Sequence, residues 1–353
     1  MGGSPLKQPE TPVPLTQLAR ERWKYSRLSA FEEAVKPSQD AQDAMTLSGV
    51  DTLDALTAAE SRTLLERLRP DTGDYPLLAT VDRDAGQMHA LRVARQQNAT
   101  IDLVRVAGTS ACLIDIAPDA QTNATLRIDA AEASHGTLYV RVGAGSHLQL
   151  TTRIIDQAAL SWTYLGIDLA EGASLVLNQQ LIGIGQHRFE TRLRFLAGNA
   201  RATVRGAALA AHGARFDQQV TVEHVAGHSV SDQRFHTAAM TKGRSTFNGR
   251  IHIHPQAPGT RADLANRNLL LDDSAEINAK PELEIYTDDV QCSHGSTVGA
   301  LDPEALFLMR SRGVPEPVAR RLLIAAFLNE TLSDADRDDA SAAIERYLAG
   351  AAP

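Results

Sequence analysis

A small turn built on glycine recurs along the middle of this chain at nearly constant intervals, and it constrains the fold more than any other feature. The turns are AGSHL at 144–148, EGASL at 171–175, AGNAR at 197–201 and AGHSV at 226–230. Their glycines, Gly145, Gly172, Gly198 and Gly227, are separated by 27, 26 and 29 residues. A nearly fixed period of this length is typical of stacked repeats that share one continuous core.

Apolar and polar residues alternate in short segments between residues 77 and 300. Examples are LYVRV at 138–142, LQLTTRI at 148–154 and VTVEHV at 220–225. Alternation of this kind is typical of β-strands closed by turns. Together with the period of the turns, it predicts a mainly β protein whose core is a β-solenoid. The strand pattern alone also permits an ordinary β-sandwich.

The residue pattern at both ends of the chain differs from that of this middle part. The start is rich in proline, glycine and polar residues. Apolar residues then recur at helical intervals from Leu15 to Leu68, and a turn-rich stretch from Pro70 ends that pattern. We therefore expect a flexible lead-in at 1–14, a helical region at 15–76, the solenoid at 77–300 and a helical module at 301–353.

The C-terminal module begins with clear helix signals. Asp302 is a good N-cap, Pro303 suits the first helical position, and Ser311, Arg312 and Gly313 then break the helix. A second helix begins near Pro315 and a third, short and acidic at its start, near Ser333. The apolar face expected for the second helix consists of Val318, Leu322, Leu323, Ala326 and Phe327.

Composition excludes several classes of function. The 353 residues include 43 acidic and 35 basic side chains, a formal net charge of -8, so the average field repels nucleic acid. Cys112 and Cys292 are too few for a disulfide framework or a self-contained cysteine cluster site, and they suit a reducing cytosol. No signal peptide is visible, and the most apolar stretch, Leu322–Leu328, is shorter than the ~18 residues of a membrane helix. We expect a cytoplasmic protein that binds neither membrane nor nucleic acid.

The motifs of common enzymes are missing. KGRST at 242–246 lacks the upstream glycine of a phosphate loop, so we expect no nucleotide on this chain. Asp288 and Asp289 resemble the acid/base carboxylates of solenoid enzymes that cleave polysaccharides, but neighbouring residues on a strand point to opposite faces. Turn or capping roles are favoured for this pair. A β-solenoid carbohydrate-active enzyme remains the alternative function.

Two pairs of residues have the spacing of metal ligands. His252 and His254 share a face if they lie on a strand, although no third ligand is evident and a structural role is favoured. Cys292 and His294 share a face in the same way, and thiolate and imidazole both bind iron. Ser293 then points away from His294, which makes them a poor nucleophile pair. From the residues alone, a buried cysteine beside a hydrogen-bonded histidine is the favoured interpretation of Cys292 and His294.

Two segments of the sequence resemble the SufB/SufD family. NRNLLLDDSAEINAKPELEIYTDDVQCSHGSTVGALDPEALFLMRSRGV, Asn266–Val314, is similar to the C-terminal signature of that family. ERWKYSRL, Glu21–Leu28, resembles the W-K-Y-T segment that SufD-type members carry early in their helical region. The repeats between these segments match by pattern only.

The resemblance implies a right-handed parallel β-helix between helical terminal regions. It also implies a scaffold subunit of iron-sulfur cluster assembly, not an enzyme, that pairs with a SufB-like subunit through the β-helix. A SufC-like ATPase would bind the C-terminal helices. The family's functional histidine falls on His294, and the cysteine of the same motif falls on Cys292. The resemblance therefore implies a transient iron-sulfur cluster at the SufB interface, with His294 as its ligand and Cys292 as the lesser candidate.

Asn266 separates the two branches of the family. SufB-like members place a cluster-building cysteine in a Q-C-D-S-L-L-I-G segment that aligns with Ala265–Asp272, and this chain has Asn266 in place of that cysteine. The chain therefore resembles the SufD branch, which would not build a cluster alone. Just upstream, residues 262–265 (ADLA) depart from the family's glutamine- and threonine-rich stretch, and the N-terminal region is short for a SufD-type member.

Overall fold

The computed structural model describes residues 22–24, 29–31, 44–49, 53–70, 74–78, 81, 88–130, 132–157, 159–333 and 337–350. The lead-in expected at 1–14 lies outside these residues, as does most of the segment Glu21–Leu28.

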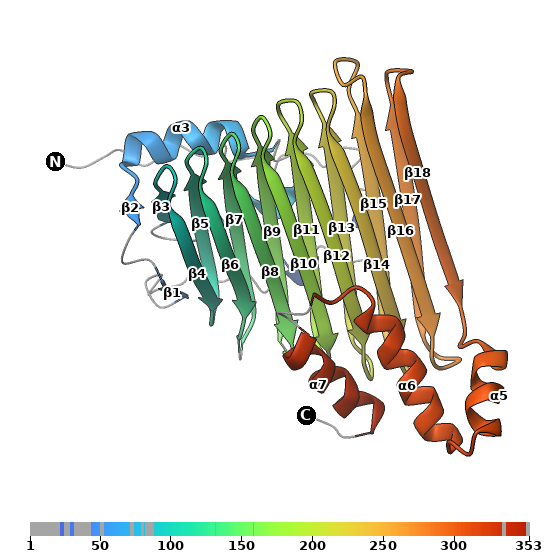
Figure 1. Cartoon of the computed structure of the whole chain (residues 1–353). Coiled ribbons are helices and arrows are strands. Elements are labelled where there is room, and N and C mark those ends of the chain that lie inside the picture. The colour runs from blue at the N-terminus through green and yellow to red at the C-terminus, as the bar shows by residue number, and fades with distance from the viewer. Residues whose placement is uncertain are drawn as a thin grey trace.

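Two sheets of nine strands each form the body of the protein (Figure 1). The first sheet contains β1 (Met45–Ser48), β4 (Asn98–Arg105), β6 (Gln121–Ile128), β8 (His147–Ile155), β10 (Ser174–Gly183), β12 (Arg201–Ala210), β14 (Val230–Ala239), β16 (Thr260–Leu270) and β18 (Val290–Gly299). The second contains β2 (Asp54–Ala55), β3 (His89–Val93), β5 (Gly108–Ile116), β7 (Ser134–Val142), β9 (Leu160–Leu169), β11 (Gln186–Phe195), β13 (Arg215–His224), β15 (Arg244–Ile253) and β17 (Glu276–Ile285).

The chain alternates between the two sheets, so each successive pair of strands adds one turn to a solenoid. From β3 to β18 every strand pairing is parallel, as in the register of β10 with β8 and β12. The prediction of a mainly β solenoid is confirmed, and the β-sandwich that the strand pattern also permitted is wrong. Turns of similar length stack because in-register strands keep the same residues beside one another from turn to turn.

The glycine period marks one corner of this solenoid. Gly145 and Gly172 have φ values of 67° and 63°, in the left-handed region where glycine carries little strain. Gly145 N donates to Glu171 O at 2.9 Å, which joins one turn to the next. In the two later repeats, the residue after the glycine takes the left-handed conformation, with φ of 62° at Asn199 and 55° at His228.

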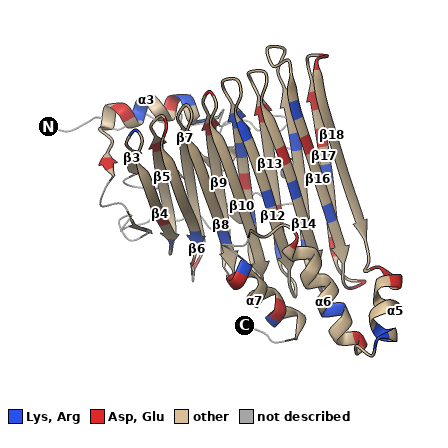
Figure 2. Ribbon diagram, in the orientation of Figure 1, with Lys and Arg blue, Asp and Glu red and all other residues tan. Residues whose placement is uncertain are grey.

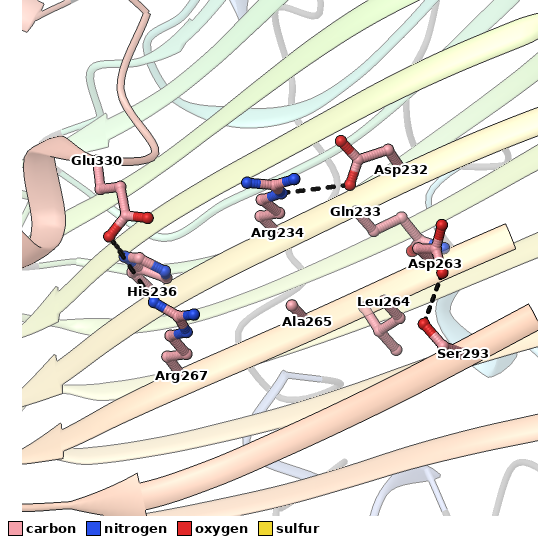
Figure 3. A pocket seen from close by; sticks show the side chains of 10 residues that line it. All are labelled: Asp232, Gln233, Arg234, His236, Asp263, Leu264, Ala265, Arg267, Ser293 and Glu330. Carbon is pink, nitrogen blue, oxygen red and sulfur yellow. Dashed lines mark hydrogen bonds and ion pairs between the residues drawn. The ribbon is translucent and has the colours of Figure 1, made fainter.

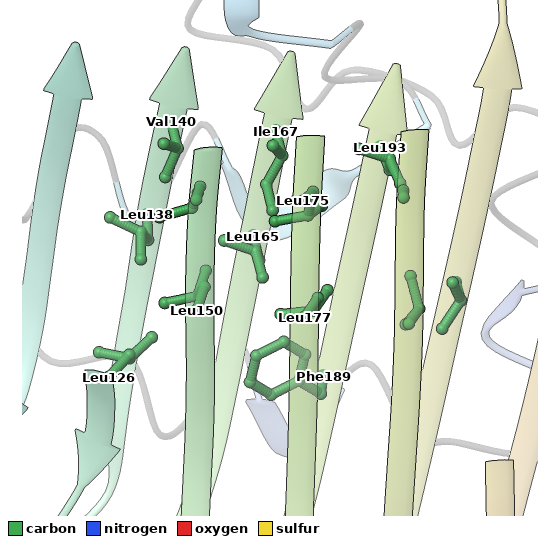
Figure 4. Packing of buried hydrophobic residues seen from close by; sticks show 14 of the residues in the cluster. Leu126, Leu138, Val140, Leu150, Leu165, Ile167, Leu175, Leu177, Phe189 and Leu193 are labelled. Atoms are coloured by element: carbon green, nitrogen blue, oxygen red, sulfur yellow. The ribbon is translucent and has the colours of Figure 1, made fainter. Parts of the chain in front are cut away.

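Apolar side chains from both sheets fill the interior (Figure 4). Leu150 lies beside Leu177 in the first sheet, and Leu138 lies beside Leu165 in the second. All four belong to one buried cluster that runs along the solenoid. Burying one such side chain stabilises the fold by about 1.5–3 kcal/mol relative to leaving it exposed.

Three C-terminal helices follow the solenoid, namely α5 (Pro303–Ser311), α6 (Glu316–Asn329) and α7 (Arg337–Leu348). Asp302 caps α5 by accepting a hydrogen bond from Glu304 N, as its position predicts. Figure 1 shows that α6 and α7 lie across one end of the first sheet. Ile324 and Tyr347 pack there in a buried cluster with residues of β10, β12 and β14.

The apolar face predicted for α6 is partly wrong. The helix buries Ala319, Ile324 and Leu328, whereas Leu322 is 52% exposed and Ala326 is also exposed. Because α6 packs against β12 and β14 on one side and against α5 on another, its apolar residues are divided between different neighbours.

The N-terminal part combines a helix with two short strands. α3 (Ala58–Leu68) begins at a capping box of Thr57 and Glu60, which the sequence analysis did not single out. It ends before Pro70, where the sequence predicts that the helical pattern stops. β1 and β2 pair antiparallel with β4 and β3, so the range 15–76 contains strands as well as helix. Among the helices that the structure describes, none is both long enough and apolar enough to cross a membrane.

Candidate functional site

The last turn of the solenoid is formed by β17 and β18, and each strand is paired on one side only. β18 pairs with β16, and β17 pairs with β15. Neither has a strand partner on its other edge among the described residues (Figure 1). Such an edge offers unpaired backbone N–H and C=O groups to any further strand.

Cys292 and His294 lie on β18 and face the same way. Cys292 is beside Ala262 of β16, and His294 is beside Leu264. Ala262 and Leu264 belong to the buried interior cluster, so this row of side chains faces the inside of the solenoid. The structure thus brings Cys292 and His294 to one face, at the end of the interior.

The two side chains differ in exposure. Cys292 is half-buried against the interior cluster, and burial raises the pKa of its thiol above the ordinary value. The charge of Asp263 raises this pKa as well, while a backbone hydrogen bond with Ala262 opposes the rise. His294 is exposed. At neutral pH the protonated thiol is a weak ligand until a metal displaces its proton, whereas His294 is directly accessible to a ligand.

Ser293 points to the opposite face, as the alternation of a strand predicts. Its Oγ donates a hydrogen bond to Asp263 Oδ1 at 2.5 Å. This contact lies in a groove of about 500 Å³ on the outer face of the first sheet (Figure 3). A Ser293–His294 nucleophile pair is therefore excluded by geometry.

The groove itself is lined by opposite charges that lie near one another. Arg234 Nε is 3.4 Å from Asp232 Oδ1, and Arg267 Nη1 is 3.9 Å from Glu330 Oε2. Ala265 contributes only a methyl group between them (Figure 3). Figure 2 shows acidic and basic residues interspersed along the strands in the same manner. We interpret the groove as an outer surface on which acidic and basic side chains neutralise one another.

Asn266 lies one strand inward from His294. It is 1% exposed and stands beside Ser296 of β18. Asn266 Oδ1 accepts hydrogen bonds from Asn268 Nδ2 at 2.6 Å and from Ser296 Oγ at 3.1 Å. Sequence reasoning missed Asn268 and Ser296, although both are two residues from a named position and so share its face. The Asn266 Oδ1 is thus satisfied at this polar end of the interior, while its Nδ2 is buried without a partner among the described residues.

The other metal candidates have structural explanations. The rings of His252 and His254 stack at 4.2 Å on the outer face of the second sheet, and His252 Nδ1 is 3.7 Å from Glu284 Oε2. Burial lowers the pKa of His252. The described residues contain no group of three or more His, Cys, Asp or Glu side chains arranged for a metal ion.

Asp288 and Asp289 lie in the bend between β17 and β18 and are exposed. Asp289 O accepts a hydrogen bond from Gly259 N at 2.7 Å, which joins this bend to the preceding turn. The turn role predicted for the pair is therefore confirmed.

The C-terminal helices expose large apolar side chains, of which the sequence analysis had named only Leu322. Phe307 is 71% exposed and Leu308 is 50% exposed, and α5 has no buried residue. Both line a depression of about 670 Å³ together with Asp302, Pro303, Glu304 and Ala305. Leu322 of α6 is 52% exposed. Exposed apolar surface of this kind commonly marks a protein interface.

Comparison with known families places these features in context. The profile for the "SUF system FeS cluster assembly, SufBD core domain" matches residues 91–327, from β3 through most of α6. The chain belongs to the SufB/SufD family. This match includes the strands that carry Asn266, Cys292 and His294, so the candidate site is part of the SufBD core.

Individual relatives favour the SufD branch. Iron-sulfur cluster assembly protein SufD of Escherichia coli is 35% identical over 213 residues, 60% of this chain and 50% of the relative. An iron-sulfur cluster assembly SufBD family protein of Synechocystis is 33% identical over 189 residues, 54% of this chain and 39% of the relative. SufD of Bacillus subtilis is 35% identical over 99 residues, 28% of this chain and 23% of the relative. The chain spans about half the length of the first relative and about two fifths of the second.

Proposed function

We propose that this chain is a SufD-like scaffold subunit of iron-sulfur cluster assembly. The observation that carries the proposal is the last turn of the solenoid, whose outer edges have no strand partner in the described part of the chain. There an exposed His294 and a half-buried Cys292 share one face. Membership of the SufB/SufD family and the similarity to SufD proteins support it.

The open edges suit a SufB-like partner that is itself a β-solenoid. A second solenoid can continue the sheets by placing its own edge strands against β17 and β18. Main-chain hydrogen bonds then supply affinity, and the side chains at the joint supply specificity. In such a complex His294 lies at the subunit interface.

The transient cluster is the cargo of this interface. Protein-bound clusters commonly have four protein ligands, and the face of β18 offers His294 and Cys292. The remaining ligands would come from the SufB-like subunit. Asn266 is buried and stands in the place of a cysteine. This supports a cluster whose ligands are shared between the two subunits, because an amide is a much weaker iron ligand than a thiolate.

The C-terminal helices would bind a SufC-like ATPase. Phe307, Leu308 and Leu322 offer exposed apolar side chains on α5 and α6. The ATPase would supply the nucleotide chemistry, and this chain would bind no nucleotide and catalyse no reaction alone. We expect the purified chain to show no turnover of ATP.

Co-expression with SufB and SufC partners tests this proposal, with a purification tag on this chain alone. We expect a stoichiometric complex of all three proteins. Val298→Lys should weaken SufB recovery at least tenfold, because Val298 is 47% exposed on β18 at the proposed joint. Leu196→Lys is the matched control, since Leu196 is 44% exposed and lies far from β18 along the solenoid. Purification of this chain alone, while SufB and SufC bind each other, would contradict the proposal.

A further inference from the structure

The interior of the solenoid holds a buried arginine near its N-terminal end. Arg105 is the last residue of β4 and is 1% exposed. Ile101 and Leu103, on the same face of this strand, belong to the buried interior cluster. Arg105 therefore projects into the interior, where a guanidinium loses its contact with water.

No carboxylate pairs with Arg105 among the residues that the structure describes. Its Nη2 donates to Thr163 Oγ1 at 2.5 Å, and its Nε has no hydrogen-bond partner within the described part of the chain. Arg188 provides the contrast. It is 0% exposed, but its Nε is 3.0 Å from Glu190 Oε1 and its Nη1 pairs with Asp217.

Hydroxyl groups surround Arg105 instead of carboxylates. Ser110, Gly136 and Thr163 lie side by side on β5, β7 and β9. A Cβ on Gly136 would overlap Arg105 Nη1 and would lie 2.8 Å from Ser110 Oγ, so the guanidinium and this hydroxyl flank the same position. Ser110 Oγ and Ser134 Oγ are both buried and have no partner among the described residues.

The nearby histidines are neutral at pH 7 and add no second positive charge beside Arg105. Burial lowers the pKa of His135 to about 3 and that of His187 to about 4, and the charge of Arg105 contributes to both shifts. Burial also lowers the pKa of Arg105, to about 9, so the guanidinium remains charged at neutral pH. An unpaired buried charge is strongly destabilising, because its lost hydration is not replaced.

We propose that a small inorganic anion of the size of chloride binds inside the solenoid beside Arg105. The guanidinium supplies the opposite charge, and the hydroxyl of Ser110 is a further hydrogen-bond donor. The ion would thereby join β4 to β5, in the first turns of the solenoid. The site is separate from the strand edges at β17 and β18.

Thermal unfolding of the full chain tests the site. Its midpoint should rise in sodium chloride relative to sodium gluconate at equal ionic strength, by about 2 °C for each tenfold increase in chloride near saturation. Arg105→Met keeps an unbranched side chain without the charge and should abolish the difference between the two salts. Arg95→Met, at an arginine whose side chain is 70% exposed, should leave it unchanged. An equal chloride effect in Arg105→Met, or none in the wild type, would overturn the site.

Bromide soaked into crystals of the wild-type chain gives a measurement that does not depend on the stability of a variant. We expect an anomalous peak within hydrogen-bond distance of Arg105 Nε. A map that shows bromide at the protein surface but no peak beside Arg105 would also overturn the proposal.

Discussion

Histidines of this chain occupy two contrasting environments. His224 is buried, its ring stacks on Phe195 at 4.3 Å, and its Nδ1 and Nε2 are 2.7 Å and 2.9 Å from the hydroxyls of Ser229 and Ser231. His294 is exposed at the end of the solenoid. Only the second environment lets an imidazole bind a ligand shared with another chain without disturbing the core.

The buried histidine predicts how stability depends on pH. Burial lowers the pKa of His224 to about 3, so between pH 6.5 and pH 3 the unfolded chain takes up a proton that the folded chain does not. This residue should lower the free energy of unfolding by about 2 kcal/mol between pH 6.5 and pH 5. His224→Gln should remove that part of the pH dependence, as measured by urea unfolding at both pH values. His212→Gln, at an exposed histidine, is the control, and an unchanged slope in His224→Gln would contradict the prediction.

For single residues, the sequence predicts which face of a strand a side chain points to better than it predicts how exposed that side chain is. The spacing of Cys292 and His294 was enough to place both side chains on one face, because strand alternation is local. Their exposure depends on β18 being the last strand of its sheet, which is a property of the assembled solenoid. The burial of Arg105 could not be predicted from the sequence for the same reason, because its neighbours come from β7 and β9.

Among the C-terminal helices, α5 is attached through partly buried residues alone. None of its residues is buried, and it packs mainly against α6. A helix held in this way can present Phe307 and Leu308 to a partner without loss of core packing. The start of α5 was predictable from Asp302 and Pro303. The face that α6 buries was not predictable, because α6 packs against the first sheet on one side and against α5 on another.

Phe307→Asp tests the role of α5. We expect recovery of SufC with the tagged chain to fall at least tenfold, because a large exposed aromatic side chain is a typical interface anchor and a carboxylate there would be buried without a partner. The unfolding temperature should be nearly unchanged, since Phe307 is 71% exposed. Leu196→Asp is the control at an exposed apolar residue on the turn after β11. Full SufC recovery with Phe307→Asp would place the binding site elsewhere.

The whole molecule is a stack with two different ends. β1 and β2 pair antiparallel with the first turn and so cover its edges, whereas no strand of the described residues pairs with the outer edge of β17 or β18. The period of the turns predicted the stack itself. It could not predict β1 and β2, which have four and two residues and are fixed by pairing with distant strands. The asymmetry between the ends supports the proposal that a partner continues the solenoid at β17 and β18.

Iron and sulfide content after anaerobic reconstitution of the complex with SufB and SufC tests the central claim most directly. His294→Ala should leave the complex assembled but lower both contents severalfold, because it removes the exposed imidazole proposed to contact the cluster. Cys292→Ser should have a milder effect, and His212→Ala should match the wild type. Wild-type iron and sulfide content in an intact His294→Ala complex would contradict the account.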